Sequence, residues 1–211
     1  MNNDVNNGHA IRNVVFFGCS CGAAGDPNYD LAKEVARAVA QSGRGIVNGG
    51  GPGIMLASTL GAKEGGGHTA VVYYNPSSAT SFEGKTGMNF ADEHYEEVNH
   101  VLRTKKLLEL GDLYMIFNGG TGTLSEFGMA WSVARLYHGH HKPLILCGKF
   151  WHSIMDGFKK HMLVRPEEYE VFTIVETVDQ ALAAMDKYEE ILKRNRHKHK
   201  QPDNAEKFLM L

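Results

Sequence analysis

The sequence predicts an α/β fold, a doubly wound, Rossmann-like parallel sheet in a single domain. Short apolar runs typical of buried parallel strands alternate along the chain with amphipathic stretches typical of helices. Three glycine-rich turns follow such runs and precede helices, at 18–25, 49–53 and 119–122. With 211 residues, 43% of them hydrophobic, the chain can bury one substantial core. Ligands of such sheets bind where the strand order reverses, so we expect the loops at Gly18 and Asn118 to meet a ligand.

The first half of the chain is expected to supply three strands and two helices. Leu31, Val35 and Val39 recur at helical spacing, and Pro52 suits the first turn of a second helix. From Asn75 to about Phe90 no periodicity is evident, which is typical of a lid or a binding loop. The predicted strands are 13–18, 45–48 and 69–74. The first predicted helix contains Leu31 to Val39 and stops at Ser42-Gly43, and the second runs from about 54 to 64.

The second half continues the alternation. Val98, Val101, Leu102 and Leu108 indicate one long amphipathic helix from about 92 to 110, which carries Arg103. The remaining predicted strands are 114–117, 143–147 and 171–175, and the remaining helices are about 123–137, 150–162 and 178–193. Residues 1–12 are predicted to be a flexible lead-in, 13–193 the domain, and 194–211 a basic, solvated tail.

Composition narrows the class of protein. A formal net charge of −2 does not suggest a nucleic-acid surface, and no run of about 18 apolar residues suggests a membrane helix. The first residues are polar, unlike a signal peptide, so a cytoplasmic protein is expected. Cys19, Cys21 and Cys147 fit neither a disulfide framework nor a zinc site and are interpreted as reduced thiols. The histidines at 138–141 end a predicted helix without a nearby acidic partner, so no metal is expected.

The segment from Phe117 to Glu126 compresses a strand end, a glycine turn and a helix start. Backbone N–H groups at such a helix start form an anion site. Glu126 has two interpretations: with Thr123 it forms the pattern of a capping box, or it serves the other end of a bound ligand. The glycine turns lack the dinucleotide and P-loop spacings. The residues alone therefore indicate a phosphorylated small molecule, or glycines used only for tight packing.

Two stretches resemble the signatures of the Lonely guy (LOG) family of nucleoside 5′-monophosphate phosphoribohydrolases. They are Gly49-Gly50-Gly51-Pro52-Gly53-Ile54-Met55 and Gly119-Gly120-Thr121-Gly122-Thr123-Leu124-Ser125-Glu126. The resemblance runs from about Asn13 to Met185 and includes the first loop, Gly18-Cys19-Ser20. Asn118 replaces the proline of the second signature, and Thr104 interrupts the family's Arg-Lys pair.

The resemblance implies that Glu126 and Arg103 are the catalytic pair, although Arg103 judged alone would be an exposed helix arginine. It implies hydrolysis of the N-glycosidic bond of a purine nucleoside 5′-monophosphate, such as an N6-substituted adenine of the cytokinin type, to free base and ribose 5-phosphate. A carboxylate suits the positive charge that develops on the ribose. The implied substrate-binding residues are Gly18, Ser20, Gly50, Gly51, Gly53, Gly119, Gly120, Thr121, Gly122 and Thr123.

The resemblance further implies a homodimer and neither metal nor cofactor, and no nucleic-acid or membrane partner is expected. A second hypothesis is a non-catalytic protein that binds or carries a nucleotide or molybdenum cofactor. Some relatives bear a lysine decarboxylase label, but that chemistry requires pyridoxal phosphate on a lysine, and no lysine stands beside a glycine phosphate loop in a convincing context. The preferred base is left open.

Overall fold

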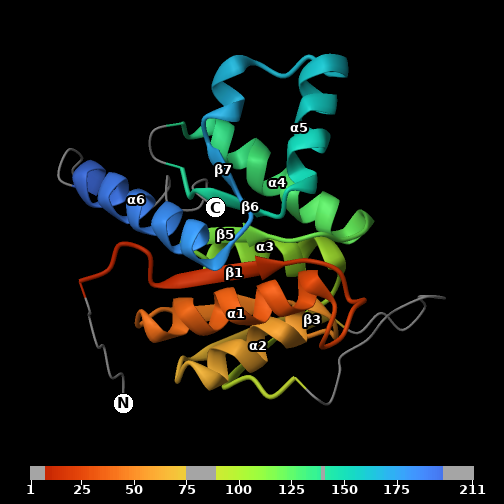
Figure 1. Ribbon diagram of the computed structural model, residues 1–211, viewed down its shortest axis with the longest axis vertical. Helices are drawn as coiled ribbons and strands as arrows, with labels where there is room; N and C mark the ends of the chain where they lie inside the picture. Colours follow the sequence, from red (N-terminus) through yellow and green to blue (C-terminus); the bar gives the residue numbers. More distant parts are fainter. Residues whose placement is uncertain (1–7, 75–88, 139–140, 197–211) are drawn as a thin grey trace.

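The computed structural model describes residues 8–74, 89–138 and 141–196 and has one seven-stranded parallel sheet flanked by helices (Figure 1). The predicted fold class is therefore confirmed. The strand order is β4-β3-β2-β1-β5-β6-β7, which places β1 at the centre and reverses the direction of winding between β1 and β5. Val15 of β1 pairs with Val47 of β2 on one side and with Tyr114 of β5 on the other.

Most elements coincide with their predicted ranges. The strands are β1 (Asn13–Phe17), β2 (Gly45–Asn48), β3 (Thr69–Tyr74), β4 (Glu93–Glu97), β5 (Leu113–Ile116), β6 (Leu144–Cys147) and β7 (Phe172–Val175). The helices are α1 (Pro27–Gln41), α2 (Ile54–Glu64), α3 (His100–Leu110), α4 (Thr121–Leu136), α5 (Phe150–His161) and α6 (Val178–Arg196), with a short 3₁₀ helix at Pro166–Tyr169.

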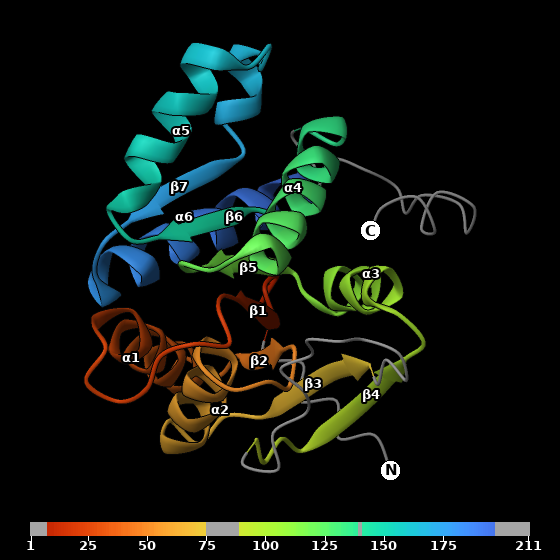
Figure 2. The ribbon, with the colours of Figure 1, turned by 90° about the vertical axis from the view of Figure 1, so that its right-hand side faces the viewer.

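Two hydrophobic clusters cover the two faces of the sheet, as strand alternation requires. Val14 and Phe16 of β1 pack with α1, α2 and α6 on one face. Val15 and Phe17 pack with α3, α4 and α5 on the other. Figure 2 shows α1 and α2 on one side of the strands and α3 on the opposite side. Because the helices cover the faces of the sheet, the loops that form the site lie at the carboxyl ends of the central strands.

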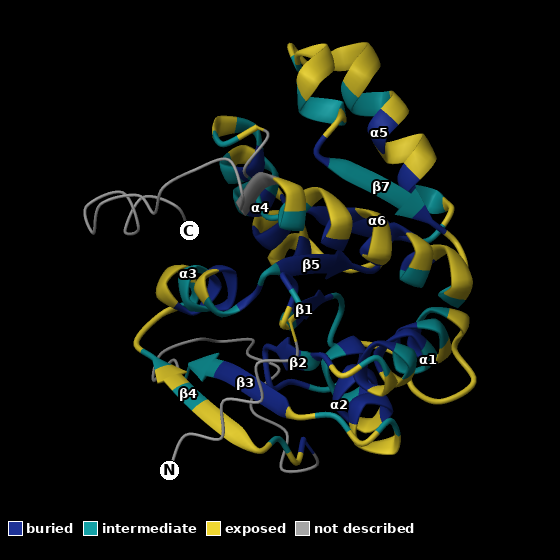
Figure 3. Ribbon diagram, turned by 90° about the vertical axis from the view of Figure 1, so that its left-hand side faces the viewer, coloured by how far each residue is buried: buried dark blue, intermediate teal, exposed yellow. Residues whose placement is uncertain are grey.

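One predicted element is wrong at its start: the helix expected from about 92 begins only at His100, where Asn99 caps it. Residues Glu93–Glu97 form the edge strand β4 instead, parallel to β3. The aspartate before it explains the pairing, because Asp92 Oδ2 accepts hydrogen bonds from the Thr69 N–H and hydroxyl. Figure 3 shows β4 as largely exposed beside the buried β3, which is why its sequence is polar.

The lead-in predicted at 1–12 is shorter than expected. Ala10 and Ile11 are buried, and their N–H groups donate to the Glu189 carboxylate of α6 at 2.6 and 2.9 Å. Residues 1–7 lie outside the described part of the chain, as do 197–211 of the predicted basic tail and 75–88 of the expected loop. In the ranges that are described, none of the helices has both the length and the apolar character to cross a bilayer.

Candidate functional site

A cavity of about 500 Å³ opens at the carboxyl ends of β1, β2, β3 and β5, within the size range of small-molecule sites. This is the crevice where the winding reverses, as predicted from the loops at Gly18 and Asn118. Its walls come from the loop after β1, the loop after β2, the end of β3, the start of α3 and the first turns of α4. The lining residues are Phe16, Phe17, Gly18, Cys19, Ser20, Cys21, Gly49, Gly51, Pro52, Met55, Tyr73, Tyr74, His100, Arg103, Gly120, Thr121, Gly122, Thr123 and Glu126.

Arg103 and Glu126 form a buried ion pair in this cavity. Arg103 Nη1 donates to Glu126 Oε1 at 3.0 Å, and the two residues are only 8% and 5% exposed. The same guanidinium donates from Nε to the Val72 carbonyl at 3.0 Å and from Nη2 to the Gly49 carbonyl at 3.2 Å. Arg103 is therefore not an exposed helix arginine. Its fork joins α4, β3 and the second glycine turn.

Burial governs the proton affinity of the carboxylate. Removal from water raises the pKa of Glu126 to about 7, although the charge and hydrogen bond of Arg103 act in the opposite direction. An acidic group that titrates near neutral pH can exchange a proton during a reaction, which is typical of general acids and bases. The cavity thus contains a permanently charged cation beside a carboxyl group poised between two protonation states.

The start of α4 differs from the capping box that the sequence suggests. The helix begins at Thr121 after the N-cap Gly120, so Thr123 lies inside the helix rather than at its cap. Within the described residues no side chain caps this end, and Glu126 bonds Arg103 instead. A Cβ atom on Gly120 or Gly122 would meet nothing within 4 Å. The first turn of α4 lines the cavity, and helix N–H groups without a side-chain cap can bind an anion.

The first two glycine turns are packed against each other. Gly53 has a φ of 62° and precedes α2, and a methyl group there would overlap the carbonyl oxygens of Cys19 and Cys21. The Ile54 N–H donates to Cys19 O, and the Cys19 N–H donates to Asn118 O, each at 2.9 Å. The loop after β1 consequently bridges the turns after β2 and β5.

The structure brings together both predicted catalytic residues and seven of the ten residues expected to bind substrate. These seven line the cavity: Gly18, Ser20, Gly51, Gly120, Thr121, Gly122 and Thr123. The other three do not line it: Gly50 and Gly53 are buried, against Val71 and the first loop respectively, while Gly119 is exposed in the turn beside Thr123. For Gly53, tight packing alone accounts for the glycine.

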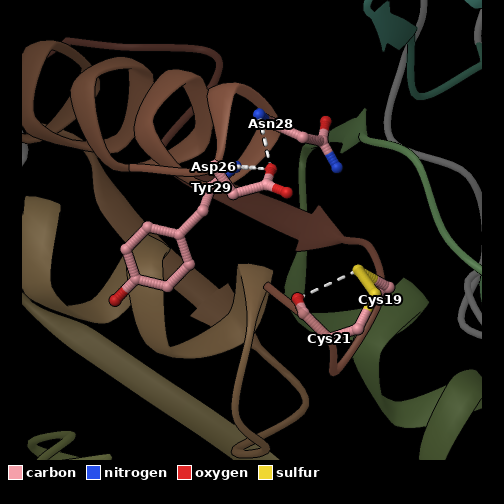
Figure 4. The surroundings of a disulfide bond; sticks show 5 residues. All are labelled: Cys19, Cys21, Asp26, Asn28 and Tyr29. Carbon is pink, nitrogen blue, oxygen red and sulfur yellow. Dashed lines mark hydrogen bonds between the residues drawn. A yellow bond between two sulfur atoms is a disulfide. The ribbon is translucent and has the colours of Figure 1, made fainter. Parts of the chain in front are cut away.

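The cysteines of the first loop differ from the expectation of three reduced thiols. Cys19 and Cys21 are joined by a disulfide in the loop between β1 and the Asp26 cap of α1 (Figure 4). The two positions are close because the chain turns back within three residues, with a Cα separation of 5.1 Å. Cys147 is a buried free thiol in β6.

Several cavity residues were not predicted. Tyr73 and Tyr74 end β3, and His100 begins α3, while Met55 lies in the first turn of α2. A signal existed for Tyr73 and Tyr74, because residues at the carboxyl end of a parallel strand face the ligand crevice. No comparable signal marked His100, because the predicted helix began too early.

The other aromatic and histidine residues are placed as follows. Trp151 of α5 is buried and Trp131 of α4 is partly buried, and both belong to the hydrophobic cluster on that face of the sheet. Gly139 and His140 of the histidine-rich segment lie outside the described residues. Within 8–74, 89–138 and 141–196, no group of three or more histidine, cysteine or acidic residues could hold a metal ion.

Comparison with protein families gives a match to the SLOG cluster4 family over residues 12–161, well over half of the chain. Comparison with curated protein sequences gives no significant match. Solved structures with the same fold are numerous, and all those described below are less than 25% identical to this chain. At that distance the likeness establishes a common fold.

Structures of two molybdenum cofactor proteins are among them. The molybdenum cofactor binding protein from the phototrophic bacterium Rippkaea orientalis has a TM-score of 0.64 and 18% identity, over 84% of this chain and 96% of that one. The Moco carrier protein from Chlamydomonas reinhardtii has a TM-score of 0.61 and 18% identity, over 87% and 98%. A third, DNA processing protein A from Helicobacter pylori, has a TM-score of 0.55 and 14% identity, over 84% and 81%.

Proposed function

We propose that this chain, which belongs to the SLOG cluster4 family, hydrolyses the N-glycosidic bond of a purine nucleoside 5′-monophosphate, releasing free base and ribose 5-phosphate. The observation that carries the proposal is the buried ion pair of Arg103 and Glu126 beside an open helix start in one cavity. The helix start suits the phosphate, and the pair suits the ribose.

The phosphate is held by backbone groups of the third glycine turn. The uncapped N–H groups of α4 supply donors and the positive end of the helix dipole, which favour a dianion. Thr121 and Thr123 line the same part of the cavity and can add hydroxyl donors. Because Gly120 and Gly122 project no side chain, the phosphate can approach the backbone closely.

Glu126 follows one helical turn later, close to where the ribose of such a ligand lies. Cleavage of the glycosidic bond leaves positive charge on the sugar, which an ionised carboxylate stabilises. The carboxylate can also accept a proton from the attacking water, a role that its pKa of about 7 suits. Arg103 holds the carboxylate by one arm of the guanidinium, and its positive charge favours the ionised form of Glu126.

Base release separates this proposal from binding alone. Purified protein is incubated with AMP, GMP, IMP, CMP and an N6-substituted AMP, and free base is measured by chromatography. We expect release from purine substrates by the wild type, loss of release in Glu126→Gln, and slower but measurable release in Arg103→Ala. Glu190→Gln, which changes an exposed glutamate of α6, is the matched control and should keep full activity. Release that survives Glu126→Gln would contradict the assigned role.

A second function is non-catalytic binding of a nucleotide or molybdenum cofactor. The two molybdenum cofactor proteins of similar fold support it, and it needs the same phosphate site but no turnover. Tight binding of AMP without base release would favour this function. The structural neighbour from Helicobacter pylori binds single-stranded DNA, so the expectation of no nucleic-acid partner stays a prediction. A gel-shift titration with a single-stranded oligonucleotide tests it.

A cytokinin-type substrate, a homodimer and a cytoplasmic location belong to the same proposal. The N6-substituted AMP arm tests the first of these. Size-exclusion chromatography with light scattering tests the dimer, and fractionation of cells that produce the protein tests its location.

A further inference from the structure

Two aromatic side chains in contact with each other line the part of the cavity formed by β3 and α3. Tyr74, the last residue of β3, and His100, the first residue of α3, have ring centroids 5.9 Å apart and ring planes inclined at 51°. Both residues line the cavity and both are half-buried. They leave ring surface facing a space that also contains Arg103.

Chain geometry places these rings on the same side of the sheet as the ion pair. Val72 packs in the cluster shared with α3 and α4, and Tyr74 lies two residues later on the same strand, so it faces the same side. His100 precedes Arg103 by three residues on α3, so the two side chains lie on one helix face. Phosphate site, ion pair and aromatic rings therefore succeed one another across one face of the sheet.

The spacing of these groups matches the parts of a nucleotide. The helix start that suits phosphate follows β5, and Tyr74 ends β3, which is three strands away in the sheet. Three strand spacings correspond to about 14 Å. An extended nucleoside monophosphate is of comparable length, with its ribose between base and phosphate. The ribose then lies beside Arg103 and Glu126, and the base reaches the aromatic rings.

We propose that Tyr74 and His100 form the subsite that binds the purine base and so determine the preference for a purine nucleotide. This inference rests on the proposed function. A flat heteroaromatic base gains from contact with aromatic side chains, and a purine presents more ring surface than a pyrimidine. Burial, assisted by the charge of Arg103, lowers the pKa of His100 and so favours its neutral imidazole. A neutral imidazole offers one donor and one acceptor to the base edge.

Binding measurements in an inactive protein test this subsite without relying on catalysis. All proteins in this test carry Glu126→Gln. AMP and ribose 5-phosphate are titrated by calorimetry into the Glu126→Gln protein itself and into the same protein with Tyr74→Phe, Tyr74→Ala or His100→Ala added. Loss of one ring contact is expected to weaken AMP binding about tenfold. Ribose 5-phosphate binding should change less than twofold. The Tyr74→Phe variant should bind AMP nearly as tightly as the Glu126→Gln protein that keeps Tyr74. Melting temperatures confirm that each variant is folded.

The outcomes separate the subsite from the reaction. Selective loss of AMP binding in Tyr74→Ala and His100→Ala supports the subsite even if the wild type never releases a base, which would overturn only the hydrolase. Equal weakening of AMP and ribose 5-phosphate, or unchanged AMP binding in both variants, overturns the subsite while leaving hydrolysis intact. If Tyr74→Ala fails to fold, His100→Ala decides by the same criterion. Failure of the Glu126→Gln protein to bind AMP at all overturns the subsite as well.

Discussion

The guanidinium of Arg103 and the carboxyl group of Glu126 meet at 3.0 Å although 23 residues separate them in the sequence. Arg103 comes from α3 and Glu126 from α4, and the strand β5 between these helices sets their separation. Because both groups are buried, removing either one leaves the other as a buried charge without its partner, which is destabilising. The pair is therefore a structural unit and the proposed reactive centre at once, and most of the expectations below depend on it.

The first prediction concerns pH. A pKa raised to about 7 leaves Glu126 protonated below neutral pH and ionised above it. If the ionised carboxylate acts on the ribose or on water, kcat/KM for AMP should rise about tenfold per pH unit below 7 and level off above it. Initial rates between pH 5 and pH 9 measure this. A rate that falls as the pH rises through 7 would mean that the protonated form is required.

The second prediction concerns Arg103→Ala. The positive charge of Arg103 favours ionised Glu126, so its removal should raise the pKa of Glu126 further and shift the pH profile to higher pH. The variant should also lose about 3–5 kcal/mol of stability, because a buried pair is broken. Arg103→Lys is the control: it keeps the charge, so its profile should stay nearer to that of the wild type. Coincident profiles for Arg103→Ala and wild type would contradict the coupling.

The third prediction compares glycines. Gly122 and Gly128 both lie in α4 with open space around a Cβ atom, so alanine at either position should stabilise the helix by about 0.5–1 kcal/mol. Only Gly122 lines the cavity, so only Gly122→Ala should weaken AMP binding. Gly53→Ala should destabilise by at least about 1–3 kcal/mol from backbone strain alone, since its φ is 62°. Thermal unfolding and AMP titration of the three variants measure these effects. Weaker AMP binding by Gly128→Ala would contradict the assignment of the effect to the cavity.

Local patterns predicted most of the fold because buried parallel strands and amphipathic helices have short, strong signals. The range predicted for β2 and that predicted for α2 agree with the structure. Edge strand β4 gave no such signal, because its polar residues are held by pairing with β3 and by Asp92, contacts that span the unperiodic segment. The predicted helix from about 92 to 110 therefore wrongly included the residues of β4 together with those of α3.

The candidate site was predictable in composition but only partly in geometry. The glycine turns and their order along the chain identify the crevice, since the rule for doubly wound sheets is topological. The capping-box interpretation of Glu126 used a local spacing, whereas the observed partner, Arg103, is fixed by packing of α3 against the sheet. The aromatic pair of Tyr74 and His100 depends on where α3 begins, which no local pattern revealed.

The fourth prediction concerns the cysteines. With Cys19 and Cys21 joined, unfolded protein that has not been reduced should contain one titratable thiol per chain, that of Cys147, and three after reduction. Native protein should react with none, because burial raises the pKa of the Cys147 thiol. Thiol titration with and without denaturant and reductant measures this. Three thiols in the unreduced protein would restore the interpretation of Cys19 and Cys21 as reduced.

The fifth prediction concerns the buried carboxylate that anchors the start of the domain. Burial alone would disfavour ionised Glu189, but hydrogen bonds from the Ala10 and Ile11 N–H groups and from Lys193 outweigh it and hold its pKa below the usual value. Glu189→Gln leaves one of the two N–H groups facing an amide donor, so it should destabilise by about 1–3 kcal/mol at neutral pH.

Acid should erase that difference. Because its pKa is depressed on folding, Glu189 contributes stability above its unfolded pKa and loses it as the pH falls through the folded value. The free energies of unfolding of wild type and Glu189→Gln should thus become equal at acidic pH. The control Glu190→Gln, which changes the exposed neighbouring glutamate, should match wild type at both neutral and acidic pH. Ile11→Ala should cost about 2–5 kcal/mol irrespective of pH, because that side chain is fully buried and uncharged. Urea unfolding at pH 7 and at acidic pH values below the folded pKa of Glu189 measures all four proteins. If Ile11→Ala were as stable as wild type, residues before Asn13 would not belong to the folded domain, and the hydrogen bonds to Glu189 could not have the role assigned to them.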